Sequence, residues 1–147
     1  MVLEEFSIDK SSNRGDEWVG RADMWAAIGR TEYVFEAKQI WVSLSNKARS
    51  TYDRIIESLK EARKDAANTK WMGAKALGII FAAPRIAPSE REKSAEFLSA
   101  FQKTLRTIDY DFMAYAFPPN ANVISTMGYL YPGVAMLARV PKRNSSS

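Results

Sequence analysis

The pattern of hydrophobic and polar positions first indicates β-structure. Two segments, Val19–Ile28 and Thr31–Trp41, are rich in β-branched and aromatic residues, and Gly29-Arg30 lies between them. A glycine-containing pair between two such segments is typical of a hairpin turn, so we expect two antiparallel strands. The pattern before this hairpin is ambiguous, because residues 2–10 fit either a short strand or one helical turn, whereas residues 11–16 indicate a loop.

The period then changes to that of a helix over Ser45–Ala67. Apolar side chains recur there at helical spacing and form one stripe: Ala48, Tyr52, Ile55, Ile56, Leu59, Ala62 and Ala66. The segment Ala76–Ala83 is an unbroken apolar run, which we expect to end at Pro84. A strand that follows a helix and is apolar on both faces is typical of a buried parallel strand.

A second helix is expected to begin at Ser89, where Glu92, three positions later, would complete a capping box. Its apolar face would consist of Phe97, Leu98, Phe101, Leu105 and Ile108. Further strands are expected at Asp111–Phe117 and Val134–Val140, with a break at Pro118-Pro119-Asn120. This order predicts an α/β domain with a mixed sheet, in which an antiparallel hairpin adjoins β-α-β crossovers of the usual right-handed sense.

The composition limits the chemistry that this domain could perform. The chain has 147 residues, enough for one domain at residues 1–140, and we expect the basic, serine-rich residues 141–147 to form a disordered tail. It contains no histidine and no cysteine. Imidazole and thiolate nucleophile systems, thiolate or imidazole zinc sites and disulfides are therefore excluded. Carboxylates, lysine, hydroxyl groups or a metal bound by oxygen remain.

The charge is positive and unevenly distributed. The formal net charge is +4, yet residues 1–17 contain five acidic and two basic side chains, so residues 18–147 carry the positive excess. Such an excess suits a phosphate-rich partner. We found no apolar run of membrane-spanning length and no signal-peptide pattern, so we expect no membrane contact and a cytoplasmic location.

The hairpin is expected to bring three chemically useful side chains together. With a two-residue loop at Gly29-Arg30, residues whose numbers sum to 59 face each other, which pairs Asp23 with Glu36. Lys38 would share their face, whereas Tyr33, Phe35, Ala37 and Trp41 would pack on the core from the other face. Opposed carboxylates repel unless a cation lies between them. Two carboxylates and the Ala37 carbonyl are suitable ligands for Mg²⁺ or Mn²⁺, and a neighbouring lysine could stabilise negative charge or orient a water.

Asp23, followed by Glu36-Ala37-Lys38 on the next strand, resembles the PD-(D/E)XK motif of restriction-endonuclease-like nucleases. The family core is a helix, three strands, a helix and a further strand, and residues 18–83 follow that order after the first helix. The resemblance implies that Asp23 and Glu36 hold the divalent metal and that Lys38 positions the water that attacks the phosphodiester. The chain departs from the family at Ala22, where the family has proline.

The resemblance therefore implies a metal-dependent nuclease with a restriction-endonuclease-like core, DNA being favoured over RNA as the substrate. The family's N-terminal helix, which often supplies another acid, has no convincing counterpart here, although Glu4, Glu5 or Glu17 could substitute for that acid. Many nucleases of this fold act as dimers, so a homodimer is allowed. Endonuclease and exonuclease action both stay open.

Other polar and aromatic residues are candidates for nucleic-acid contact because they would flank this site: Arg21, Trp25, Gln39, Lys47, Arg49 and Lys75. The remaining charges of the first helix indicate a solvated face with ion pairs such as Glu57–Lys60 and Glu61–Lys64. Two alternatives stay open. The hairpin charges could form only a solvent-facing ion-pair network, or the chain could be a non-catalytic protein of the same fold that binds nucleic acid or a protein partner.

Overall fold

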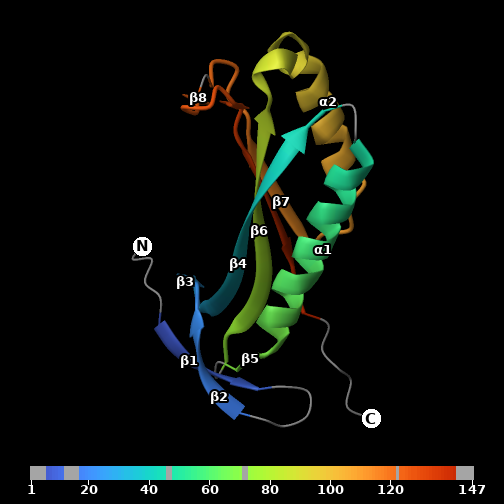
Figure 1. Cartoon of the computed structure of the whole chain (residues 1–147). Coiled ribbons are helices and arrows are strands. Elements are labelled where there is room, and N and C mark those ends of the chain that lie inside the picture. The colour runs from blue at the N-terminus through green and yellow to red at the C-terminus, as the bar shows by residue number, and fades with distance from the viewer. Residues whose placement is uncertain (1–5, 12–16, 46–47, 71–72, 122, 142–147) are drawn as a thin grey trace.

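The computed structural model describes residues 6–11, 17–45, 48–70, 73–121 and 123–141. Its largest element is a mixed sheet that contains the strands β3 (Met24–Ile28), β4 (Thr31–Leu44), β6 (Lys75–Ile86), β7 (Phe112–Ala116) and β10 (Val134–Arg139). These lie in the order β3-β4-β6-β10-β7 (Figure 1). Two short strands lie beside the C-terminal end of β6. β9 (Leu130–Tyr131) pairs with β6, and β8 (Val123–Ile124) pairs with β9.

A second, smaller sheet lies near β3 and the N-terminal end of β6 (Figure 1). It has the order β2-β1-β5 and consists of the strands β1 (Phe6–Ser11), β2 (Glu17–Ala22) and β5 (Thr69–Lys70). The described part of the ambiguous N-terminal segment is thus a strand rather than a helical turn, because Phe6–Ser11 pairs with β2 along its whole length, while residues 2–5 lie outside the described residues.

Two helices connect parallel strands of the large sheet. α1 (Ala48–Ala67) joins β4 to β6, and these two strands are parallel. The 3₁₀ helix η1 (Pro88–Lys93) and α2 (Ser94–Leu105) join β6 to β7. Because β10 is antiparallel to both β6 and β7, β7 runs parallel to β6. The α/β class, the mixed sheet, the hairpin at its edge and the β-α-β connections are confirmed.

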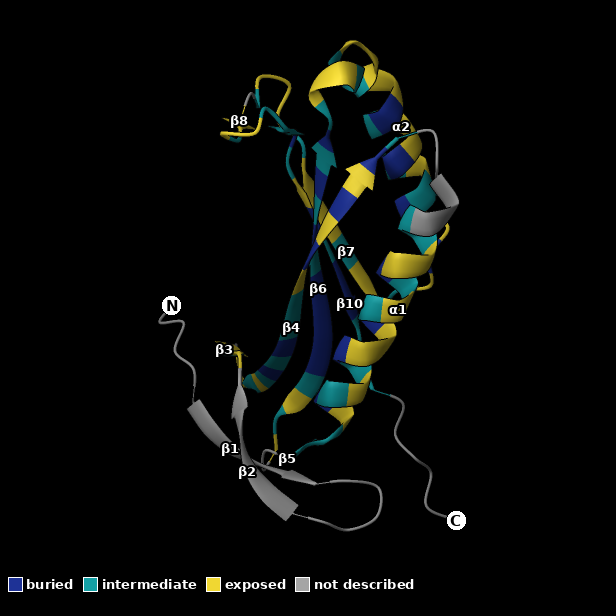
Figure 2. Ribbon diagram, in the orientation of Figure 1, coloured by how far each residue is buried: buried dark blue, intermediate teal, exposed yellow. Residues whose placement is uncertain are grey.

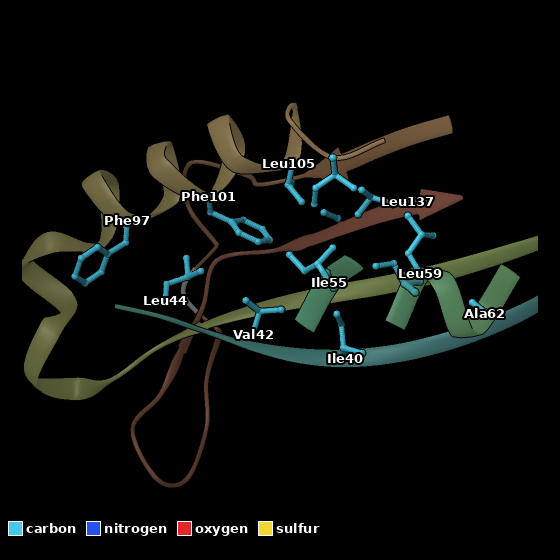
Figure 3. Close-up of a cluster of buried hydrophobic side chains, with 14 of the residues drawn as sticks. Ile40, Val42, Leu44, Ile55, Leu59, Ala62, Phe97, Phe101, Leu105 and Leu137 are labelled. Atoms are coloured by element: carbon cyan, nitrogen blue, oxygen red, sulfur yellow. The ribbon is translucent and has the colours of Figure 1, made fainter. Parts of the chain in front are cut away.

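Both helices cover one face of the sheet, and the main core lies between them and that face (Figures 1 and 3). From β4 the core receives Ile40, Val42 and Leu44, which alternate along the strand. The helices contribute their apolar stripes: Ile55, Leu59 and Ala62 from α1, and Phe97, Phe101 and Leu105 from α2. The apolar periodicity of both segments therefore identified the side that packs on the sheet.

α1 approaches the sheet most closely at Gly78 of β6. A Cβ atom at Gly78 would lie 2.3 Å from the backbone nitrogen of Arg63 and 2.4 Å from the carbonyl carbon of Ala62. These are backbone atoms, which cannot move aside as the end of a side chain can. The missing side chain at Gly78 therefore sets the distance between α1 and β6.

Neither α1 nor α2 covers the opposite face of the sheet (Figure 2). A smaller apolar cluster lies on that face. Leu77, Ile79 and Ala138 are buried there, and the flanking side chains are partly buried: Met24, Tyr33, Phe35, Ala37, Phe81 and Met136. The prediction that Tyr33, Phe35 and Ala37 pack on a core is confirmed for this smaller cluster, whereas the main core lies on the other side of β4, under the helices. The same prediction is wrong for Trp41, which belongs to neither cluster. Trp41 is 43% exposed and packs edge-on against Tyr131, at 5.2 Å between ring centroids.

Some predicted boundaries differ from the structure. The segment Val19–Ile28 is not one strand, because the chain bends at Asp23 between β2 and β3. β6 continues through Pro84 to Ile86 instead of ending there. The pairing of β6 with β10 stops at Ala82. No β10 residue therefore pairs with Pro84, and the N–H that proline lacks is not needed on that side of β6.

The second helix also begins later than predicted. Ser89 lies inside η1, whose N-cap residue is Ala87 with an extended backbone and no side-chain cap hydrogen bond, so the capping box at Ser89 does not form. Pro88 at the first position favours this tight initial turn. Neither α1 nor α2 combines the length and apolarity that crossing a membrane requires, and the described residues form no other α-helix. Except for Pro141, the predicted tail lies outside the described residues.

Candidate active site

The β3–β4 hairpin has the register expected from its sequence. Ile28 pairs with Thr31 and Trp25 with Val34, around the two-residue turn Gly29-Arg30. Gly29 has φ +62°, and Arg30 does not have a positive φ, because only glycines do among the described residues. A positive φ at the first turn residue alone is typical of a type II′ turn, which favours glycine there. The ladder ends at Met24, paired with Phe35. The expected Asp23–Glu36 pair is therefore not part of the ladder, which ends one step before it.

Just beyond the ladder, the side chain of Asp23, rather than its backbone, is hydrogen-bonded to β4. The Ala37 N–H donates a hydrogen bond to Asp23 Oδ2, at 2.7 Å. Ile28 and Thr31 are the pair next to the turn, so the backbone N–H and C=O groups of Thr31 point toward β3. Since these directions alternate along a strand, the other odd-numbered residues of this part of β4 also point toward β3. The bend at Asp23 removes the backbone partner of Ala37, and the carboxylate supplies the acceptor. Asp23 is therefore held against the middle residue of the Glu36-Ala37-Lys38 triplet.

Glu36 is a buried charged residue of the described chain, with 7% of its surface exposed. The Thr69 hydroxyl, at the start of β5, donates a hydrogen bond to Glu36 Oε1 at 3.1 Å. Glu36 shares the helix-covered face of β4 with Ile40 and pairs in register with Gly78. This carboxylate does not face open solvent, so the alternative of a solvent-facing network does not describe Glu36.

Lys38 reaches toward α1 rather than toward the other two site residues. Its Nζ lies 2.9 Å from Asp65 Oδ2 and 3.9 Å from Glu61 Oε2. The hydrogen bond to Asp65 raises the pKa of Lys38 above its ordinary value, as do the charges of Asp65, Glu61 and Asp23, while partial burial opposes the rise.

The ion pairs predicted along α1 do not form. Glu61 pairs with Lys38 rather than Lys64, and no ion pair joins Glu57 to Lys60. The sequence therefore failed to reveal Asp65, Glu61 and Thr69 as contacts of the site. The spacing of Glu61 and Asp65, four residues apart on one flank of the helix, could have identified them as partners of a lysine on the neighbouring strand.

The candidate ligands are oxygen donors, which are chemically suited to a hard divalent ion. The Asp23 carboxylate and the Ala37 carbonyl lie at the same strand edge, because the Ala37 N–H bonds to Asp23. The Glu36 carboxylate lies on the helix-covered face, where it accepts a hydrogen bond from Thr69. Within the described part of the chain, no group of three or more acidic residues is arranged to hold a metal ion.

The predicted nucleic-acid contacts are spread over the molecule. Trp25 is 36% exposed and shares the face of Val34. Gln39 is exposed on the opposite, helix-free face, because it pairs with Phe81. Arg49 lies in the first turn of α1, sixteen residues and about 24 Å along the helix axis from Asp65, so it does not flank the site.

The other three candidates are placed differently. Lys75 begins β6 and lines a cavity near Thr69. Arg21 belongs to β2, where its Cα pairs with that of Ser7. Lys47 lies outside the described residues, as do the candidate acids Glu4 and Glu5, while Glu17 begins β2.

Comparison with known proteins identifies no relative. No family model matches the chain, and neither the curated proteins nor the solved structures contain a significant match. The functional argument therefore depends on the geometry of the site.

Proposed function

We propose that this protein is a divalent-metal-dependent nuclease that hydrolyses phosphodiester bonds. The observation that carries the proposal is the 2.7 Å hydrogen bond between the Ala37 N–H and Asp23 Oδ2. It brings an aspartate at the bend between β2 and β3 against the Glu-Ala-Lys triplet of β4. Two carboxylates and a lysine at adjoining positions are the groups that metal-assisted hydrolysis needs when histidine and cysteine are absent.

The order of elements supports the same proposal. An antiparallel hairpin is followed by α1 and by the parallel strand β6, as in the core of restriction-endonuclease-like nucleases. β1 and β2 precede this hairpin as a further antiparallel pair. We propose this core as the finer assignment of the α/β fold, together with the cytoplasmic location and the preference for DNA.

Each residue has a role that follows from its surroundings. Asp23 and Glu36, with the Ala37 carbonyl, would hold Mg²⁺ or Mn²⁺, which when bound polarises the phosphate and makes water more acidic. Lys38 has a raised pKa because Asp65 binds its ammonium, so it is protonated at neutral pH. It therefore acts as a fixed positive charge beside developing negative charge, and not as a general base. Asp65 and Glu61 are positioning residues, since they hold Lys38.

The test is cleavage of single-stranded and double-stranded DNA and of RNA, with Mg²⁺, Mn²⁺ or EDTA. We expect cleavage that requires the metal, with DNA cut faster than RNA. Asp23→Asn keeps an oxygen that can accept the Ala37 N–H, and Glu36→Gln keeps one for Thr69, so both variants should fold. Each should lose about 100-fold or more in rate, as should Lys38→Met.

Glu57→Gln is the matched control, because Glu57 is an exposed acid of α1 with no ion pair to another described residue. It should cleave like the wild type. Activity that persists in EDTA, or in Glu36→Gln protein prepared in the same way, would contradict the proposal.

A non-catalytic nucleic-acid-binding protein is the second candidate. The observation that favours it is the engagement of Lys38 by two carboxylates of α1, which gives the lysine a structural role without any metal. Thermal unfolding separates the candidates. A nuclease site should raise the melting temperature in Mn²⁺, and Asp23→Asn should abolish the rise. A binding protein would show no such rise, and its nucleic-acid affinity would depend on salt but not on the metal.

A further inference from the structure

A cavity of about 1000 Å³ lies at the C-terminal end of α1, away from Lys38. Its walls come from the last two turns of α1, from the first residues of β4 and β6, and from Phe112 of β7 and Val140 after β10. The volume is at the upper end of the range for ligand pockets, so a nucleotide unit can enter.

The lining is strongly basic. It contains four basic side chains and no acidic one among the described residues: Lys60, Arg63, Lys64 and Lys75. None of the four forms an ion pair with another residue that the structure describes. The C-terminal end of α1 contributes about half a negative charge through the helix dipole, which four full positive charges outweigh. The cavity therefore favours an anion.

α1 keeps its acidic side chains away from this cavity. At about 100° per residue, Glu61 and Asp65 fall on one side of the buried residues Ala62 and Ala66 and Arg63 on the other, while Lys60 and Lys64 lie on the outer side of the helix. Glu61 and Asp65 hold Lys38 on the β4 side and do not line the cavity. An anion in the cavity would thus meet cations and no acidic lining residue of the described chain.

Aromatic side chains accompany the cations. Tyr33 of β4 and Phe112 of β7 line the part of the cavity on the helix-free face of the sheet, since Phe112 pairs with Ala138, and Phe112 is 55% exposed. An exposed phenylalanine in a cavity that also contains cations can stack on a base while the cations contact phosphates.

We propose that this cavity binds a single-stranded nucleic acid, with phosphates on the α1 cations and Lys75 and a base on Phe112. A duplex keeps its bases stacked and paired, so it cannot present one to an aromatic side chain inside a cavity. The inference deepens the proposed nuclease function, on which its biological meaning rests. Binding is measured without metal, however, so the two proposals can fail separately.

Fluorescence anisotropy with labelled oligothymidine, oligouridine and a duplex of equal length, all in EDTA, provides the test. Both single strands should bind more tightly than the duplex. The comparison of oligothymidine with oligouridine shows whether the cavity prefers DNA or RNA. Affinity should fall with salt, and the slope of log K against log salt should drop by about 0.7 for each lost phosphate contact. Lys60→Ala with Lys64→Ala should show that reduced slope. Phe112→Ala should weaken binding about tenfold.

Two further variants protect this test against trivial explanations. Lys60→Arg with Lys64→Arg keeps both charges and should bind like the wild type. Lys103→Ala removes an exposed cation of α2, outside the cavity, and should also bind like the wild type. Duplex binding as tight as single-strand binding, or equal losses in Lys103→Ala and in the cavity variants, would overturn the proposal. Cleavage failing while this binding persists would instead reject only the nuclease.

Discussion

The two flanks of α1 carry opposite charges and meet opposite surroundings. On the β4 side, Asp65 and Glu61 neutralise Lys38 beside the candidate metal ligands. On the far side, Lys60, Arg63 and Lys64 line a cavity with no acidic described residue. In the sequence these charges alternate, which is typical of a solvated helix face with internal ion pairs. The fold separates them because Glu61 and Asp65 contact Lys38 of β4, whereas the cations line the cavity.

This difference shows that the partner of a helix charge is set by packing as well as by spacing. Acids and bases three residues apart contribute only a few tenths of a kcal/mol when they pair on an isolated helix. A lysine on a neighbouring strand can be the partner instead: Glu61 pairs with Lys38 of β4 and not with Lys64 of its own helix. The bases released from pairing then become available to an external anion.

The largest effect should follow from Gly78→Ala, which disturbs both flanks together. The new methyl group would meet backbone atoms of Ala62 and Arg63 at 2.3–2.5 Å, so α1 must move away from β6. We expect a loss of about 3 kcal/mol in the free energy of unfolding, measured by urea denaturation. Metal-dependent stabilisation and oligonucleotide binding should both weaken.

Gly29→Ala is the comparison for Gly78→Ala. Gly29 has a positive φ but nothing within 4 Å of an added Cβ, so its substitution reports backbone strain without a clash. It should cost about 1 kcal/mol. A Gly78→Ala protein as stable as the Gly29→Ala protein would show that the distance of α1 from β6 is not set by this glycine.

An intermediate effect should follow from Thr69→Val, at the point where the two regions meet. Thr69 lines the cavity, and its hydroxyl donates to the buried Glu36 carboxylate. Valine removes one donor from that carboxylate, which should lower the free energy of unfolding by about 1–2 kcal/mol. Thr69→Ser keeps the hydroxyl and should lose less. Equal losses in the two variants would mean that the hydrogen bond contributes nothing measurable.

Much of the fold could be predicted because its elements have strong periodic signals. The stripe from Ile55 to Ala66 identified the buried side of α1, and the β3–β4 register followed from the two-residue turn at Gly29-Arg30. The two-residue strands β5, β8 and β9 were not predicted, since so short a segment has no period. Pro84 misled the prediction because proline is tolerated wherever a strand has no neighbour on its N–H side.

The candidate site was predicted only as far as the hairpin extends. The sequence brought Asp23 next to the triplet, but the contact is a side-chain hydrogen bond to the Ala37 N–H rather than the predicted pair with Glu36. Asp65, Glu61 and Thr69 reach the site from α1 and β5, so their contacts depend on how the helix packs on the sheet. The sequence placed Tyr33, Phe35 and Ala37 on a core, but it did not show which face of β4 the helices cover. Both faces carry apolar side chains, so alternation alone could not distinguish them.

The smallest effect is a pH dependence confined to the Lys38 flank. Asp65 raises the pKa of Lys38 above the ordinary value of about 10.4, so the ammonium binds its proton more tightly in the folded state. Its contribution to stability is therefore complete below pH 10.4 and is lost as the pH rises through the higher folded value. The pair is partly exposed, with 34% of the Lys38 and 44% of the Asp65 side chain accessible, which limits the contribution to about 0.5 kcal/mol.

The comparison of Lys38→Met with Lys60→Met isolates this contribution from other groups that titrate at alkaline pH. Urea denaturation between pH 8 and pH 11.5 should show the wild type more stable than Lys38→Met up to about pH 10, with the difference shrinking above it. Lys60 has no ion pair with a described residue, so the difference between the wild type and Lys60→Met should not shrink in this way. If both differences change alike with pH, the two flanks of α1 are electrostatically equivalent in the folded protein, and the separation of partners described above does not hold in solution.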